Sequence, residues 1–137
     1  MEKNLTLTND VQQVTLLEDY INTIAEEADI DMSLALSLNL ALEEAVTNVI
    51  LYAYPEGQTG TVDIKAIVDD SRRLTFIISD SGIPFDPTQK EDADVTLSVE
   101  ERPIGGLGIF LVKQIMDDVT YERTNDRNIL SMAKQLP

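Results

Sequence analysis

The spacing of apolar residues changes once along this chain, and that change limits the folds it can adopt. Between residues 9 and 54 apolar residues recur every three or four positions, which is the period of an amphipathic helix. From residue 61 to 79 they alternate with polar residues or form a short apolar run, as strands do. Paired strands that follow helices favour a sheet with helices packed on one face.

The same patterns predict the order β-α-α-β-β-loop-α-β-β. Asn9, with Gln12 in capping-box position, is expected to begin the first helix, and Asp31 the second. The expected elements are a strand at 3–8, helices from Asn9 to Ala28 and from Asp31 to about Pro55, strands at 61–69 and 74–79, a helix at 106–117, and a C-terminal hairpin with strands at 119–123 and 129–134. We therefore expect a two-layer α/β sandwich with a mixed, mainly antiparallel sheet, the apolar strand 74–79 near its centre, and one domain spanning residues 1–137.

Composition excludes several functions. The 137 residues include 25 acidic and 10 basic ones, giving a net charge of −15, which disfavours nucleic acid and anionic membranes as partners. The chain has no Cys and no His, so these residues supply no thiolate, no histidine-ligated zinc and no phosphohistidine acceptor. With no uninterrupted run of about 18 apolar residues and no signal-peptide pattern, we expect a soluble cytoplasmic protein.

The first candidate site lies in the second helix. Glu44 and Asn48 are one helical turn apart on one face, within a mostly apolar stretch. One interpretation is a solvated helix edge whose Asn fixes a neighbouring loop. The other is a metal and base pair, because an Asn oxygen suits Mg²⁺ and a nearby carboxylate can deprotonate an attacking hydroxyl or water.

Two further segments have residue types that suit a nucleotide. Asp80-Ser81-Gly82 follows the apolar strand: Asp80 can accept a hydrogen bond from an amino group such as that of adenine, and Gly82 leaves room for a flat ring. The segment is also an ordinary turn sequence. Gly105-Gly106-Leu107-Gly108 opens a helix and would expose N–H groups to an anion, although a flexible hinge explains it equally well.

In this order the three segments resemble the N, G1 and G2 boxes of the GHKL (Bergerat-fold) ATPases. The stretches ALEEAVTNVILYAYPEG, IISDSGIPFDP and GGLGIFLVKQIMDDVTYER are similar to the small anti-sigma-factor serine kinases of bacteria. The resemblance extends from about residue 5 to 135. It implies the histidine-kinase-like ATPase fold, with ATP and Mg²⁺ as cofactors.

The resemblance also implies a role for each matching residue. Glu44 would be the general base, Asn48 the Mg²⁺ ligand and Asp80 the residue that reads adenine, with Gly82 beside it. Glu43 is expected on the surface. The remaining nucleotide-binding residues that it implies are Gly105, Gly106, Leu107 and Gly108.

Two features differ from the family pattern. Arg127-Asn128 stands where the family often has Gly-Thr at the start of the last strand, a Thr that supports the adenine pocket. The segment from about 85 to 105 is acidic, and we expect it to be a mobile lid in the absence of nucleotide.

The function implied by the resemblance is an ATP-dependent serine kinase of a partner-switching circuit. Such a kinase phosphorylates a small STAS-type anti-anti-sigma protein and, when free, sequesters a sigma factor; the sequence leaves a homodimer open. The alternative is a nucleotide-gated binding module without significant catalysis. The catalytic half of a histidine kinase is disfavoured, because the chain has no His and no dimerising helical hairpin.

Overall fold

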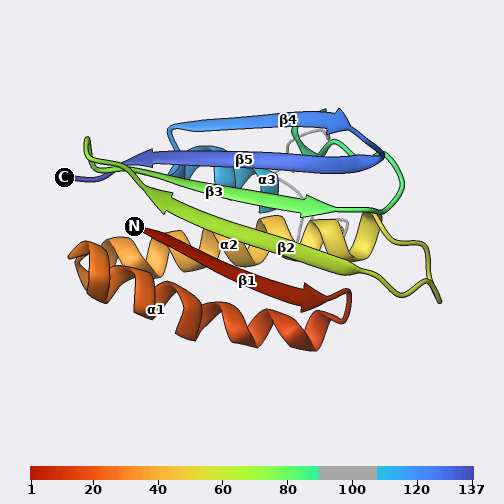
Figure 1. Cartoon of the computed structure of the whole chain (residues 1–137), viewed down its shortest axis with the longest axis horizontal. Coiled ribbons are helices and arrows are strands. Elements are labelled where there is room, and N and C mark those ends of the chain that lie inside the picture. The colour runs from red at the N-terminus through yellow and green to blue at the C-terminus, as the bar shows by residue number, and fades with distance from the viewer. Residues whose placement is uncertain (90–107) are drawn as a thin grey trace, which may run out of the picture.

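The computed structural model describes residues 1–89 and 108–137 of the chain. Within them, helices cover one face of a five-stranded sheet (Figure 1). The elements are β1 (Glu2–Thr8), the 3-10 helix η1 (Val11–Thr15), α1 (Leu16–Ala28), α2 (Met32–Tyr52), β2 (Thr61–Val68), β3 (Arg73–Asp80), the 3-10 helix η2 (Pro87–Gln89), α3 (Gly108–Ile115), β4 (Asp118–Thr124) and β5 (Arg127–Gln135).

The strands lie in the order β1-β2-β3-β5-β4, and all four pairings are antiparallel. The predicted central place of the apolar strand is confirmed, because β3 pairs with β2 on one side and β5 on the other. The C-terminal hairpin also forms, closed by Asn125 and Asp126, both with positive φ. Its register places Asn128 directly opposite Asp80, which brings the start of β5 to the end of β3.

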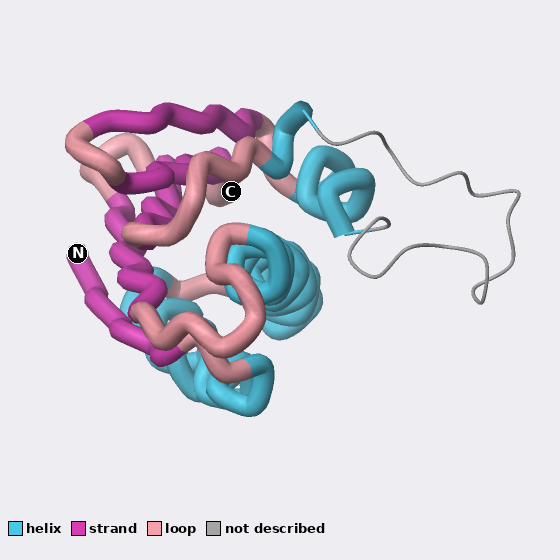
Figure 2. Tube along the Cα trace, turned by 90° about the vertical axis from the view of Figure 1, so that its right-hand side faces the viewer, coloured by secondary structure: helices cyan, strands magenta, loops and turns pink. Residues whose placement is uncertain are grey.

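The core lies between the sheet and the helices. Alternate residues of β3, namely Leu74, Phe76 and Ile78, point into it and are at most 1% exposed. Helix α2 contacts both α1 and α3, and Figure 2 shows it between them on one side of the sheet. Its second half is therefore buried on several sides, at Ala41, Leu42, Ala45, Val46, Asn48, Val49 and Ile50.

Helix α2 is also long and apolar enough to cross a membrane, judged by length and composition alone. Half of its most apolar window is buried within the molecule, however, where it packs beneath the sheet. The core helix of a folded domain has the same composition, and burial accounts for the apolar character of α2 here.

Capping residues begin both long helical segments, one as expected and one not. Asp31 caps α2, accepting a hydrogen bond from Leu34 N at 2.8 Å. The prediction of Asn9 as the first cap is wrong: Asp10 accepts from Gln12 N at 2.9 Å and begins η1. Asn9 instead links the end of β1 to the residue just before β2, since its Oδ1 accepts from Gly60 N at 3.0 Å.

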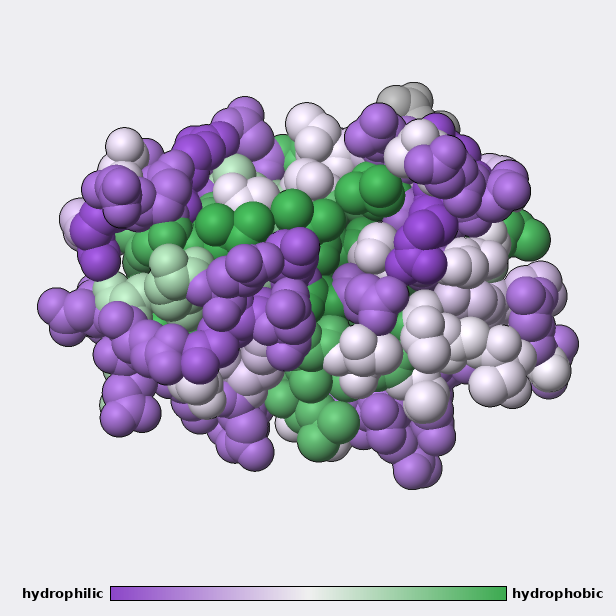
Figure 3. All heavy atoms as spheres, viewed as in Figure 1, coloured by the Kyte–Doolittle hydropathy of each residue, from purple (hydrophilic) through white to green (hydrophobic). Residues whose placement is uncertain are grey.

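The other face of the sheet has no described element over it. Residues such as Thr75, Ile77 and Ser79 of β3 point to this side and are half-buried by their neighbours on adjacent strands. Figure 3 looks onto this face and shows a hydrophobic band across its middle, bordered by hydrophilic residues. Small and β-branched side chains cover one another across strands in this way without a second layer.

Candidate functional site

Asn48 is a buried residue of α2 with one unsatisfied atom. It is 2% exposed, so a solvated helix edge does not describe it. Its Nδ2 donates to the Glu44 carbonyl oxygen at 3.0 Å, which fixes the amide, while its Oδ1 is buried and accepts no hydrogen bond from the described residues. A buried acceptor without a partner costs about 1–3 kcal/mol. The arrangement therefore suits a cation or donor brought by a ligand.

Glu44 lies one turn before Asn48 and is half-buried. Burial, and secondarily the charge of Glu43, raises the pKa of its carboxyl above the usual value. A raised pKa makes the ionised carboxylate a stronger proton acceptor. Glu43, expected on the surface, is half-buried, and its Oε1 accepts from Asn39 Nδ2 at 3.2 Å.

Asp80, the last residue of β3, is 1% exposed. Its Oδ1 accepts from Gly82 N at 2.8 Å and from Asn128 Nδ2 at 2.9 Å. Burial raises the pKa of the Asp80 carboxyl, and these two hydrogen bonds together with the charges of Arg123 and Arg127 offset part of the rise. Both hydrogen bonds from the described residues end on Oδ1, so Oδ2 has accepting capacity left for a ligand.

Asn128 holds this region together. Its Nδ2 donates to Asp80 and also to the Ile83 carbonyl oxygen at 2.8 Å. Its Oδ1 accepts from Phe85 N at 3.1 Å and from the Tyr121 hydroxyl. The sequence left open whether Asn128 takes the place of the family's Thr; the structure places it against Asp80 and the following loop. Tyr121 was missed, and only the strand register, which pairs it close to Asn128 across the hairpin, could have indicated it.

Gly82 is needed for a reason that the sequence did not reveal. A Cβ at this position would lie 2.2 Å from the Ala53 carbonyl oxygen, just beyond the end of α2. The next residue, Ile83, donates its N–H to the same oxygen at 2.8 Å. The described contacts thus give Gly82 a packing role against Ala53, and the expected role of leaving room for a flat ring stays a prediction. Gly82 lets the loop after Asp80 pack directly on the end of the helix that carries Asn48.

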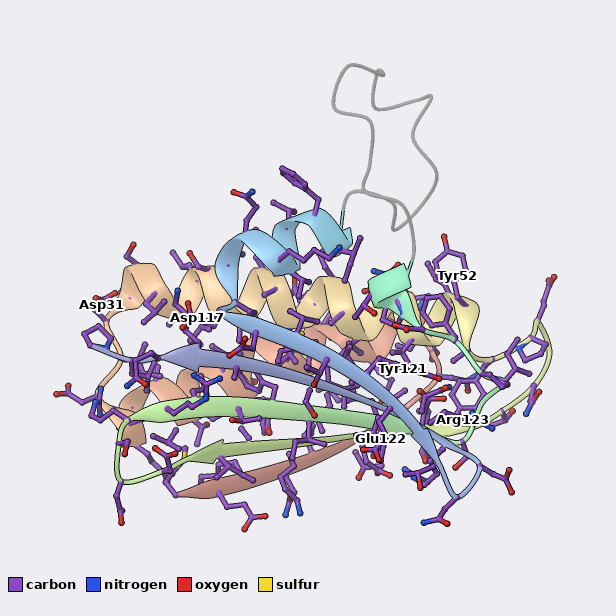
Figure 4. The ribbon with its side chains drawn as sticks, turned by 90° about the horizontal axis from the view of Figure 1, so that it is seen from above. Asp31, Tyr52, Asp117, Tyr121, Glu122 and Arg123 are labelled. Atoms are coloured by element: carbon purple, nitrogen blue, oxygen red, sulfur yellow. The ribbon has the colours of Figure 1, made fainter. Side chains whose placement is uncertain are left out.

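Aromatic residues not singled out in the sequence lie at the same end of the molecule. The rings of Tyr52, the last residue of α2, and Phe85 have centroids 5.5 Å apart. Figure 4 shows Tyr52, Tyr121 and Arg123 around the loop that carries η2. Arg123 Nη1 donates to the Gly82 carbonyl oxygen at 2.9 Å, which ties β4 to that loop. Flat apolar surfaces beside a hydrogen-bonding carboxylate suit a planar heterocycle.

The glycine segment is only partly visible. Gly108 is the first residue of α3, so the predicted helix is present from there to Ile115. Gly105, Gly106 and Leu107 lie outside the described residues, as does most of the expected lid at 85–105. The structure therefore brings together Asp80, Gly82 and the end of α2, and leaves the anion-binding prediction for the glycines as a prediction.

The chain belongs to the histidine kinase-like ATPase domain family, whose model matches residues 7–134. This description of the family implies ATP as the nucleotide. Two solved structures share the fold: the histidine kinase domain of the Erythrobacter litoralis EL346 blue-light activated histidine kinase, and a second structure of that kinase. Their TM-scores are 0.58 and 0.60 and their identities 19% and 18%, covering 88% and 91% of this chain and 61% and 41% of theirs.

Among characterised proteins, the chain is similar to kinases that act on serine. It is 36% identical over 103 residues to the serine-protein kinase RsbW of Bacillus subtilis, and 32% identical over 103 residues to RsbW of Listeria monocytogenes. Each match covers 72% of this chain and, respectively, 63% and 65% of the relative, so the chain spans just under two thirds of their length. The serine/threonine-protein kinase BtrW of Bordetella bronchiseptica is 26% identical over 73% of this chain and 70% of BtrW.

Proposed function

We propose that this protein is an ATP-dependent serine kinase and anti-sigma factor of a partner-switching circuit. It transfers the γ-phosphoryl group of ATP to a serine of a small STAS-type anti-anti-sigma protein, and it sequesters a sigma factor when that antagonist is phosphorylated. The proposal places this activity in one domain, residues 1–137, in the cytoplasm. The relatives named serine-protein kinase RsbW and serine/threonine-protein kinase BtrW support the choice of a serine acceptor.

The observation that carries the proposal is the buried, unpaired Oδ1 of Asn48 one turn from Glu44. An amide oxygen is a hard ligand of the kind Mg²⁺ accepts, and Mg²⁺ in nucleotide sites takes few protein ligands because phosphates and water complete its shell. No group of three acidic residues that could hold a metal occurs in the described part of the chain, which agrees with such a sparse site. Asn48 would hold the ion, and bound Mg²⁺ would neutralise phosphate charge.

Glu44 is proposed as the group that accepts the proton of the acceptor serine. One turn from Asn48, it would lie beside the phosphates that the Asn48 site is proposed to hold. Because burial raises its pKa, the carboxylate takes up a proton more readily than an exposed glutamate does. The serine oxygen would attack the γ-phosphorus as its proton moves to Glu44, and ADP would leave.

Asp80 is proposed to select adenine. Its Oδ1 is held by Gly82 and Asn128, so the carboxylate cannot rotate freely, and Oδ2 can accept from the amino group of adenine. Guanine offers a carbonyl at the corresponding edge, which would leave the buried carboxylate facing another acceptor. Tyr52 and Phe85 lie close enough to each other to form one apolar wall beside the base.

The direct test is phosphate transfer by the intact protein. Purified protein is incubated with radiolabelled Mg-ATP and a candidate small STAS-type protein from the same organism, and a version of that substrate with its acceptor serine replaced by alanine is the control. We expect label on the serine only, and none when EDTA removes the metal. Nucleotide binding without transfer to any such substrate would instead favour the nucleotide-gated binding module.

Asn48→Ala tests the proposed metal site by nucleotide binding. Because Asn48 is proposed to hold the metal, the variant should lose the Mg²⁺-dependent part of ATP affinity, measured by calorimetry with and without the metal. An unchanged dependence on Mg²⁺ would remove Asn48 from this role. Asn39→Ala, at another α2 asparagine with an unpaired buried Oδ1, is the matched control.

A further inference from the structure

A concave surface lies between α1 and α2, away from the candidate nucleotide site. It has a volume of about 430 Å³ and is lined from α1 by residues such as Ala25 and from α2 by residues such as Ala35. Asp31 begins α2 at one end of the molecule, whereas Tyr52 ends it near the candidate site (Figure 4). Residues of the first half of α2 line the groove, whereas the candidate site uses residues of its second half. A ligand in the groove therefore leaves room for a nucleotide in the candidate site.

The α2 wall of the groove is unusually apolar for a solvent-facing surface. Met32 and Leu36, which line the groove, are 80% and 66% exposed, and Leu40, one turn further on and outside the lining, is 41% exposed. Their four-residue spacing aligns them as a strip about 12 Å long. A helix face that only meets water normally carries polar residues at such positions. A continuous apolar strip beside a groove is typical of a surface that binds another protein.

The charges around the groove all have one sign. Glu18, Glu26 and Asp29 line it, and no Lys or Arg of the described residues does. Arg72 contacts the end of α1, donating to the Ala28 and Asp29 carbonyl oxygens at 2.7 and 3.5 Å, and lines the neighbouring cavity, which shares Asp29 with the groove. Among the described residues the groove therefore combines an apolar wall with an acidic rim that has no basic side chain in its lining.

We propose that this groove binds an amphipathic, basic helix of a partner protein. The apolar face of such a helix would cover Met32 and Leu36, and its flanking Lys or Arg side chains would face Glu18 and Glu26, which are about 12 Å apart along α1. A second copy of this chain fits poorly, because its net charge of −15 would bring acid against acid. The proposal goes beyond the kinase function and holds whether or not the protein transfers phosphate.

The buried Oδ1 of Asn39 adds a polar anchor. Asn39 lines the groove, its Nδ2 is used by Glu43, and its Oδ1 accepts no hydrogen bond from the described residues. An arginine or lysine of the bound helix would supply the missing donor once the Asn39 side chain turns its Oδ1 toward the groove. Apolar contact would then provide most of the affinity, and the acidic rim would set the charge of the partner and the dependence on salt.

The test uses the nucleotide-free protein and a synthetic helix. A peptide of about four turns (~16 residues), with Leu at every fourth position and Lys beside them, is titrated into ¹⁵N-labelled protein. A peptide of the same composition in scrambled order, and one with Glu in place of Lys, are the controls. We expect amide shifts confined to α1 and the first half of α2, with the amphipathic basic peptide alone.

Matched variants locate the binding surface. Leu36→Ser should weaken binding about tenfold, as expected for an apolar contact at the centre of an interface, whereas Leu51→Ser, an exposed leucine of the same helix outside the groove, should not. Glu26→Gln should weaken it about two- to threefold at low salt, and its neighbour Glu27→Gln should not, because Glu27 does not line the groove. All four sites are exposed, and thermal unfolding checks that each variant folds.

Three results would overturn the proposal. One is equal binding of the scrambled or the acidic peptide, and another is a set of shifts centred on the open sheet face or on the end of α2. The third is an equal effect of the Leu36 and Leu51 substitutions. Since no nucleotide or phosphate transfer is involved, loss of binding and loss of kinase activity are distinguished by separate measurements.

Discussion

Two asparagines are almost completely buried in the described residues, and they differ in how their amides are used. Asn128, 3% exposed, has partners for both ends of its amide: Asp80 and Ile83 on the nitrogen, Phe85 and Tyr121 on the oxygen. Asn48, 2% exposed, uses only its nitrogen. Buried polar atoms are nearly always paired, so an exception in an otherwise well-packed helix needs a cause.

The difference separates a supporting role from a binding one. The four hydrogen bonds of Asn128 join β3, the loop after it and the β4–β5 hairpin, and hold the Asp80 carboxylate in one orientation. The unpaired oxygen of Asn48 lowers the stability of the empty protein, and it would gain a partner only when a ligand is present. Asn128 therefore supports the candidate site by holding Asp80 in place, whereas Asn48 is proposed to contact the ligand directly.

The largest expected effect tests whether Glu44, one helical turn from Asn48, takes part in phosphate transfer. Glu44→Gln should lower phosphate transfer about 10²–10⁴-fold, because a general base acts mainly in the transition state, and should leave ATP affinity within about twofold. Single-turnover transfer and calorimetric titration measure the two quantities. Glu43→Gln, at the neighbouring half-buried carboxyl, is the control and should transfer normally. A matching loss of ATP affinity in Glu44→Gln would make that residue structural or a ligand of the metal.

The next effect tests whether Asp80, which Asn128 holds in place, selects adenine over guanine. Because Asp80 can accept from the amino group of adenine, ATP should bind about 100-fold more tightly than GTP. Asp80→Asn should weaken ATP binding strongly and reduce that preference, whereas Asp70→Asn in the exposed β2–β3 turn should change neither. Calorimetry with both nucleotides decides, and equal affinity for ATP and GTP in the unaltered protein would exclude Asp80 from base selection.

Stability without nucleotide compares the two asparagines directly. Asn128→Ala removes one of the two hydrogen bonds to Asp80 and takes the Asn128 partner from the Ile83 carbonyl and the Phe85 N–H, so the free energy of unfolding should fall by about 3 kcal/mol. Asn48→Ala loses one bond to a carbonyl that the helix already uses and removes an unsatisfied atom, so the loss should be about 1 kcal/mol or less. Urea unfolding of both variants measures the difference. Equal losses would mean that Asn48 has a structural partner.

The sequence predicted the elements because their patterns are local. The helical period, the Asp31 cap and the alternation in β2 each depend on residues a few positions apart, and the structure confirms them. The choice between Asn9 and Asp10 as cap failed because Asn9 is occupied by a contact with Gly60, far along the chain. Capping rules consider only neighbours in sequence and cannot include such a competitor.

The site was predicted less completely, for the same reason. Glu44, Asn48 and Asp80 could be named from motifs, but their roles remain proposals. The supporting contacts depend on pairs far apart in sequence: Asn128 with Asp80 across the β3–β5 register, and Gly82 with Ala53 across the end of α2. Neither pair has a pattern in the sequence, since each arises only when strands and helix are assembled.

The smallest expected effect is the response of Asp80 to pH, and it has opposite signs for stability and for binding. Burial raises the pKa of Asp80 above its usual 3.8, so just above that value the folded protein holds a proton that the unfolded chain has released. The contribution of this group to the free energy of unfolding therefore falls as pH rises through the window between the two pKa values. Only the ionised carboxylate accepts from adenine, so ATP affinity should rise through the same window, by at most about tenfold per pH unit.

Asp80→Asn should flatten the pH dependence of both stability and ATP affinity, and Asp70→Asn should flatten neither. Urea unfolding and calorimetry between about pH 4 and pH 7 measure them, and an ATP affinity that falls as pH rises through the window would show that the protonated carboxyl is the form that binds.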